Sequence, residues 1–276
     1  MKIHRSLLSI VFILVIIFVL SGLGNGASPT SNIGFGNATM PNNTVVSFGK
    51  TALSAVPVVI VSGQWNSVPW LTAAEKISKK SFIFKFYNPN SHQPIENANM
   101  TWMQYIAVVP DPKSPVLRAG SCSCKDGDYI KFSSKLSDTP IVVCSAENGS
   151  GVPLYANPAN IDSGQFQISL KDMEGKPADG KLQYIAVLPS SSAVNYQNVK
   201  ITAGSVDIIG GENIKYGFDF SDTPEAIVCS AYCEGMPNIA VASLSNASFF
   251  IGNIANFGGA NPTDSSKFYW FGVSSK

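Results

Sequence analysis

The sequence is poor in charge and in histidine, and each shortage excludes a class of function. Only 13% of its 276 residues are charged and the net charge is +1, so nothing favours binding to nucleic acid or to an anionic membrane. The two histidines are His4 and His92, too few for a histidine-based triad or metal site. No Gly-rich phosphate loop leads from a strand into a helix. We therefore expect no enzymatic activity and no cofactor; the carboxylates Asp126, Asp128, Asp172 and Glu174 leave a carboxylate-pair hydrolase as a minor alternative.

Long hydrophobic runs are also scarce, and the one that is present opens the chain. Lys2 and Arg5 precede an apolar run over residues 7–20, and small residues suited to cleavage follow it up to Ala27. This order is typical of a signal peptide, and the run is shorter than the roughly 20 residues that span a bilayer. Residues 1–27 are thus interpreted as a signal peptide or an N-terminal anchor. The protein is expected to be secreted or held at the cell surface, with a membrane contact only if this segment is retained.

The remaining chain repeats with a fixed period. Pro69, Pro153 and Pro237 are 84 residues apart (153 − 69 and 237 − 153), and Phe82, Phe166 and Phe250 keep the same spacing. The closing motif drifts, from 105–108 to 184–187 to 270–273, because one loop before the last strand varies in length. A fixed period of this kind indicates tandem structural units. The predicted modules are residues 31–110, 116–190 and 199–276.

Each module has the pattern of an all-β fold. Apolar, β-branched runs such as 57–61 and 141–144 are bounded by turn residues, as buried strands are. The segments starting at Phe82, Phe166 and Phe250 alternate apolar and polar residues, which predicts strands with one buried face. Only residues 71–80 offer a weak helical alternative. We expect six short antiparallel strands per module, arranged as a β-sandwich.

Cysteines and sequons agree with an exported protein. In an oxidising compartment one or two disulfides are expected, but an odd number leaves at least one thiol free or paired between chains, and small buried side chains are an equal alternative for Cys122 and Cys124. A zinc site is disfavoured because Cys-x-Cys lacks the usual spacer. The cysteines are Cys122, Cys124, Cys144, Cys229 and Cys233. The candidate glycosylation sites are Asn37, Asn42, Asn99, Asn148 and Asn246, each in an N-x-Ser/Thr sequon.

The order of these landmarks resembles the H-type lectin domain, a six-stranded β-sandwich of agglutinins and discoidins. A Gly-led first strand (119–122, 203–206) precedes a Pro-led apolar strand, then a Phe-centred strand (164–166, 248–250), and the module ends with an aromatic-Ile-Ala strand (184–186). The resemblance implies a trimer with sugar bound near the subunit seams, so we hypothesise that the three modules close into a pseudo-trimer within one chain. The family's Arg and Trp-His sugar contacts are replaced here, by Pro at the Arg position and by Met173-Glu174 or Phe257-Gly258 at the Trp-His position. Any sugar site is therefore a rebuilt one.

A rebuilt sugar site needs an aromatic face against the pyranose and polar groups for its hydroxyls. The candidate carbohydrate contacts are Trp65, Trp70, Asp126, Asp128, Tyr155, Glu174, Tyr232 and Phe257. The leading hypothesis is a carbohydrate-binding protein of recognition or adhesion, whose partners are glycans or glycoproteins. The alternative is a structural extracellular protein that uses the same sandwich for self-association, with the aromatic residues covering the ends of each sandwich.

Overall fold

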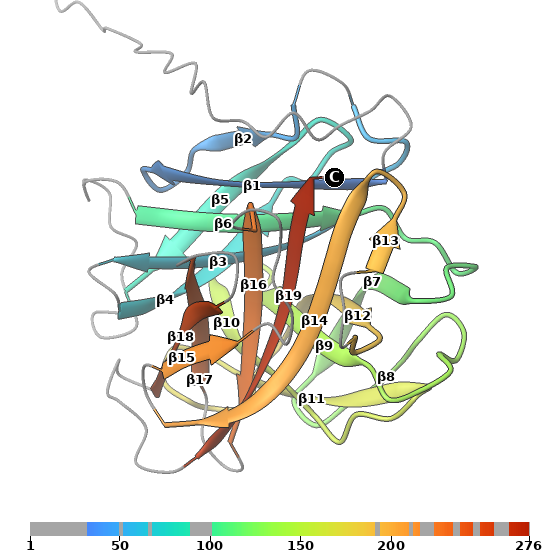
Figure 1. Cartoon of the computed structure of the whole chain (residues 1–276). Coiled ribbons are helices and arrows are strands. Elements are labelled where there is room, and N and C mark those ends of the chain that lie inside the picture. The colour runs from blue at the N-terminus through green and yellow to red at the C-terminus, as the bar shows by residue number, and fades with distance from the viewer. Residues whose placement is uncertain are drawn as a thin grey trace, which may run out of the picture.

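A computed structural model gives the fold as all-β, as the sequence predicts. It describes residues 32–49, 52–65, 68–88, 101–190, 194–209, 212–215, 224–233, 238–244, 249–256 and 265–275. These residues form nineteen strands and no helix (Figure 1), so the described part of the chain offers no helix able to cross a membrane. The segment with a helical alternative is a strand up to Glu75. The export segment lies outside the described residues.

The strands fall into three sets with the same order, which we call repeats 1, 2 and 3. Repeat 1 forms a sheet in the order β1-β6-β3-β4-β5-β2, and repeat 2 forms one in the order β7-β12-β9-β10-β11-β8. In repeat 3 the corresponding strands lie in two sheets, β13-β14-β19-β16 and β15-β18-β17, the first of which includes the additional strand β13. All pairings are antiparallel.

The strand bounds are as follows. Repeat 1 has β1 Ile33–Met40, β2 Val45–Ser47, β3 Val58–Trp65, β4 Val68–Glu75, β5 Ser81–Tyr87 and β6 Thr101–Val108. Repeat 2 has β7 Leu117–Lys125, β8 Tyr129–Lys131, β9 Ile141–Glu147, β10 Pro153–Ala159, β11 Gln165–Lys171 and β12 Asp179–Val187. Repeat 3 has β13 Val194–Tyr196, β14 Val199–Ile208, β15 Glu212–Lys215, β16 Ala226–Tyr232, β17 Asn238–Leu244, β18 Phe249–Asn256 and β19 Ser266–Ser275.

Each repeat folds over a core of its own. We call β1-β6-β3, β7-β12-β9 and β14-β19-β16 the inner halves, and β4-β5-β2, β10-β11-β8 and β17-β18-β15 the outer halves. In the outer halves, β5 and β11 bury every second side chain, as the alternating sequence predicts. Phe82, Phe166 and Phe250 are fully buried in the three cores, where each ring packs edge-on against an aromatic ring of the closing strand.

The inner halves also bury their second face, in one core that all three repeats share. Figure 1 shows the strands of the repeat 3 inner half crossing those of repeat 1. Alternate residues of all three inner halves meet in a single apolar cluster, among them Ile60, Val143, Ile185, Val228 and Phe271. Because β9 and β16 are covered on both faces, each begins with an unbroken apolar run, residues 141–144 and 226–229.

A second contact between all three repeats joins their outer halves. Leu71, Tyr155 and Ile239 are 84 residues apart (155 − 71 and 239 − 155) and lie in one buried cluster with Met173. Equivalent positions of the three repeats therefore meet at one place, as they do around a threefold axis.

Three glycines let the closing strand pack tightly. Gly36, Gly120 and Gly204 are 84 residues apart (120 − 36 and 204 − 120), and each lies under an aromatic ring of the last strand of its repeat. A Cβ at Gly120 would lie 2.5 Å from the Tyr184 hydroxyl oxygen, and one at Gly204 would lie 2.7 Å from the Trp270 ring. Only glycine leaves room for these rings.

Buried glutamines join neighbouring repeats across two seams. The Gln104 side chain of repeat 1 accepts a hydrogen bond from the Ile227 N–H (2.9 Å) and donates one to the Ala242 carbonyl (2.7 Å) of repeat 3. At the equivalent place in repeat 2, Gln183 accepts from the Val59 N–H (2.9 Å) and donates to the Ala74 carbonyl (3.5 Å) of repeat 1. Each amide satisfies backbone groups that the seam removes from water.

Replacing Gln104 by Ala should destabilise the whole protein, because the buried Ile227 N–H loses its acceptor. We expect a loss of about 2–3 kcal/mol in the free energy of unfolding, measured by chemical denaturation. Lys131→Ala, on the exposed face of β8, is the control and should change stability by less than about 0.5 kcal/mol. Equal stability of the two variants would show that the amide does not hold the seam.

Candidate ligand-binding groove between repeats 2 and 3

Two of the predicted aromatic contacts lie in the interior. Tyr155 is fully buried between the repeats, and Trp70 is 3% exposed and packs against Phe86 with ring centroids 5.3 Å apart. Neither ring presents a face to a ligand. Both were predicted from their place in a polar loop, but β4 and β10 carry them inward, where the repeats meet.

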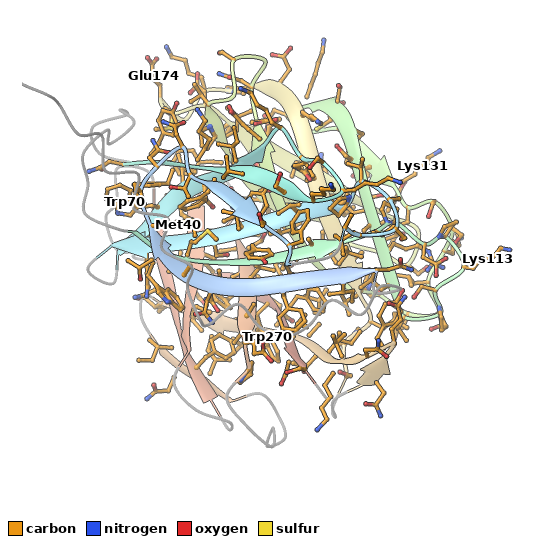
Figure 2. The ribbon with its side chains drawn as sticks, turned by 90° about the horizontal axis from the view of Figure 1, so that it is seen from above. Met40, Trp70, Lys113, Lys131, Glu174 and Trp270 are labelled. Carbon is orange, nitrogen blue, oxygen red and sulfur yellow. The ribbon has the colours of Figure 1, made fainter. Side chains whose placement is uncertain are left out.

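The predicted acidic contacts serve turns and ion pairs of repeat 2. Asp126 accepts the Leu170 N–H (2.7 Å) and pairs with the Lys171 ammonium (2.6 Å), while Asp128 accepts the Lys125 N–H (2.8 Å) within the β7–β8 turn. Glu174 is exposed and pairs with Lys176. Figure 2 shows Glu174 at the periphery of the molecule, far from Trp270. Among the described residues, the partners of these carboxylates are thus backbone amides and lysines of repeat 2 itself.

Of the remaining predicted contacts, only Tyr232 has a described side chain. It is partly exposed at the end of β16, directly across from Lys267 of β19. The Trp65 side chain and the whole of Phe257 lie outside the described residues. Among the described aromatic candidates, Tyr232 is thus the one whose cross-strand neighbour lines a hollow in the surface.

That hollow is a groove of about 850 Å³ between repeats 2 and 3. Repeat 3 contributes the ends of β14 and β19, and repeat 2 contributes the segments around Pro140, Ile161 and Pro189. The volume is in the range of sites that hold small molecules. Sequence reasoning missed the groove because it lies between repeats rather than in a loop of one repeat.

A tyrosine at a glutamine position distinguishes this seam. The closing strands align as Gln104-Tyr105, Gln183-Tyr184 and Tyr269-Trp270, so Tyr269 occupies in repeat 3 the place of the two bridging glutamines. Its phenol cannot join a backbone N–H and a backbone carbonyl of the next repeat with the two-sided geometry of an amide. Tyr269 instead lines the groove. Extending the alignment of the closing motifs by one residue toward the N-terminus would have drawn attention to this residue.

On the inner half of repeat 3, the groove is lined by Ser205, Lys267 and Tyr269, and Asp207 and Tyr232 lie beside it as neighbours of Lys267. Antiparallel register places Ser205 of β14 beside Tyr269, and Asp207 and Tyr232 on either side of Lys267. The Lys267 ammonium lies 3.5 Å from the Asp207 carboxylate. Chiefly burial, and also the nearby Asp207 and Tyr232, raise the pKa of Tyr269 to about 12. The phenol thus stays neutral at physiological pH and can both donate and accept a hydrogen bond.

The seam stays closed nearer the centre of the molecule. There the Ser230 hydroxyl of repeat 3 accepts the Cys144 N–H of repeat 2 (2.9 Å), and the Asn157 amide of repeat 2 donates to the Ala231 carbonyl (2.6 Å). Ser62 of repeat 1 makes the same kind of bond to the Cys229 N–H (3.2 Å). Hydrogen bonds between repeats 2 and 3 therefore close the inner part of this seam, and the groove lies farther out.

The five cysteines are all free thiols, so the disulfides expected from the sequence are not formed. Cys144 and Cys229 are fully buried, and burial raises the pKa of both, that of Cys144 to about 12. They act as small core residues where repeats 2 and 3 meet repeat 1. Cys122 and Cys233 are partly exposed.

The described sequon asparagines take part in local structure. Asn37, in β1, donates to the Glu225 carbonyl (2.7 Å). The side-chain oxygen of Asn42 accepts the Asn43 and Phe86 N–H groups (3.0 and 3.1 Å), and that of Asn148 accepts the Ser150 and Val152 N–H groups (2.9 and 3.0 Å). Asn99 and Asn246 lie outside the described residues. Glycosylation remains a prediction from the sequons.

Comparison of the chain with protein-family models, with curated proteins and with solved structures finds no match.

Glu147 ends β9 as Tyr232 ends β16, at the seam of repeats 1 and 2. Its ionised form is destabilised there. Its pKa is raised, chiefly by burial and then by the neighbouring Glu75, against the opposing effect of Lys181 and Lys85. A carboxyl whose pKa is raised on folding favours the native state less once pH exceeds that pKa, because the ionised form is disfavoured there.

Glu147→Gln should therefore raise the free energy of unfolding at pH 8 and leave it nearly unchanged at pH 4, where the wild-type carboxyl is largely protonated in the unfolded chain. Denaturation at both pH values measures the difference. Glu174→Gln, on the exposed turn, is the matched control. A Glu147→Gln variant that is less stable at pH 8 would contradict the assignment.

Proposed function

We propose that the chain is a single-chain counterpart of a trimeric H-type-lectin-like assembly. The three sets of strands have the same order, which supports three sandwich modules. The interactions run in one direction around the molecule: repeat 1 reaches repeat 3 through Gln104, repeat 2 reaches repeat 1 through Gln183, and repeat 3 reaches repeat 2 through Ser230. This cyclic pattern is what three modules around a pseudo-threefold axis require.

On this framework the protein binds carbohydrate outside the cell, as a secreted or surface protein of recognition or adhesion. The groove between repeats 2 and 3 offers the chemistry of a sugar site. Tyr269 supplies an aromatic face of the type that packs on the apolar side of a pyranose. Ser205, Asn213 and Lys267 line the same groove and supply donors and acceptors for sugar hydroxyls.

One observation carries this proposal: the seam without a bridging glutamine is the seam with an 850 Å³ groove and a tyrosine in it. The family's sugar sites lie near subunit seams, so the place agrees with the resemblance although the residues are new. A site of this kind discriminates shapes of neutral sugars, since Lys267, the charged residue in its lining, is already paired with Asp207 beside the groove.

The test is a glycan array with purified protein from residue 28 onward and with a Tyr269→Gln variant. Glutamine is the residue at this position in repeats 1 and 2, so the variant should fold, bridge to repeat 2 and narrow the groove. We expect wild type to bind a defined set of sugars and the variant to lose about 10-fold or more in affinity, a change of about 1.4 kcal/mol.

Tyr129→Ala is the control, since Tyr129 is 54% exposed on β8 and lies outside the groove. It should bind as wild type does. An array without any bound sugar, or sugar binding that is unchanged in Tyr269→Gln, would sink the proposed site. In the first case self-association into a structural assembly becomes the better account.

A further inference from the structure

Repeat 2 carries two thiols side by side on one face of an edge strand. Cys122 and Cys124 are two residues apart in β7, and the intervening Ser123 is exposed, so both sulfur atoms lie on the face that packs toward the core of the repeat. Cys124 is buried and Cys122 is partly exposed. On β12, Gly180 lies across from Cys124 and Leu182 lies across from Cys122.

The pair is reached from solvent through a hollow of about 490 Å³. β7 and β8 stand at the two ends of the strand order of repeat 2, so the curled sheet brings them to its open side. The hollow is lined by both strands, with Cys122, Cys124 and the Tyr184 ring at its inner side and Ile130 and Lys131 opposite.

The other repeats place hydrocarbon or thioether side chains here. Counting from the equivalent glycines, the matching pairs are Ala38 with Met40 in repeat 1 and Val206 with Ile208 in repeat 3. All four belong to, or pack against, the core of their repeat. The fold at this position therefore requires only apolar bulk, and the paired thiols of repeat 2 are an addition to it.

The two thiols are poorly placed to form a disulfide with each other. Same-face neighbours on a strand have Cα and Cβ atoms separated by about 6.4–6.8 Å, whereas a disulfide needs Cβ atoms about 3.5–4.5 Å apart. Both residues nevertheless line the same hollow. This spacing is better suited to a ligand atom bound by both sulfur atoms than to a disulfide between Cys122 and Cys124.

We propose that Cys122 and Cys124 form a two-sulfur site for a soft, thiophilic metal ion, represented by Cu(I). Thiolate sulfur is the ligand type that such an ion selects. The described residues contain no cluster of three or more His, Cys, Asp or Glu side chains suited to a metal. A zinc ion with four protein ligands would therefore lack ligands there. Cu(I) accepts two sulfur ligands.

Binding releases protons and needs no redox partner. The ion forms two Cu–S bonds, and the two thiols release their protons to solvent. No electron is transferred.

Anaerobic titration of the reduced, purified protein with Cu(I), in competition with a colorimetric Cu(I) chelator, tests the site. We expect one tightly held ion per chain and two short Cu–S distances by X-ray absorption. Affinity should fall as pH is lowered, because protons compete with the ion for the two sulfur atoms.

Cys122→Val and Cys124→Ile introduce the residues of repeat 3 and should fold as wild type does, yet each should lose the ion. Cys233→Ser removes the other partly exposed thiol and should keep it. The proposal is overturned if wild type does not compete for Cu(I), or if the Cys122→Val/Cys124→Ile double variant still binds one ion. Loss of binding in Cys233→Ser alone would equally overturn it, by placing the ion elsewhere.

Discussion

The burial of the inner-half strands on both faces is the constraint on which this structure depends. One face of each inner half closes the core of its own repeat, and the other joins the core shared by all three. A repeat on its own would expose residues such as Ile60, Val143 or Phe271 to water, at a cost of about 1.5–3 kcal/mol for each large side chain. Linking three repeats in one chain removes the concentration dependence that a trimer of separate subunits has.

Covalent linkage also allows the three seams to differ. A symmetric trimer repeats every residue three times, so a substitution that opens one seam opens all of them. Here Gln104 and Gln183 bridge two seams through buried amides, while Tyr269 leaves the third as a groove. Repeat 2 similarly carries the thiol pair at a place where the other repeats have apolar side chains. Glutamine amides bridge two seams along the closing strands, whereas the third is held by Ser230 and Asn157 and opens as a groove at Tyr269.

The all-β fold could be predicted because spacing and alternation are local properties of the sequence. The 84-residue period is enough to locate equivalent positions, including those of Pro69 and Phe82. Burial across repeats could not be predicted in the same way. Tyr155 stands in a polar loop pattern, yet its place at the meeting point of three repeats makes it core. Tyr269 was missed because the compared closing motif begins one residue later, at Tyr105, Tyr184 and Trp270, and so leaves out the position of the bridging glutamines.

Calorimetric unfolding of the protein from residue 28 onward tests most directly whether the three repeats depend on one another. The shared core predicts a single transition in which the calorimetric and van't Hoff enthalpies agree, because no repeat can lose its inner half without exposing the other two. Separate transitions for individual repeats, or a calorimetric enthalpy well above the van't Hoff value, would contradict the account and describe three independent domains in a row.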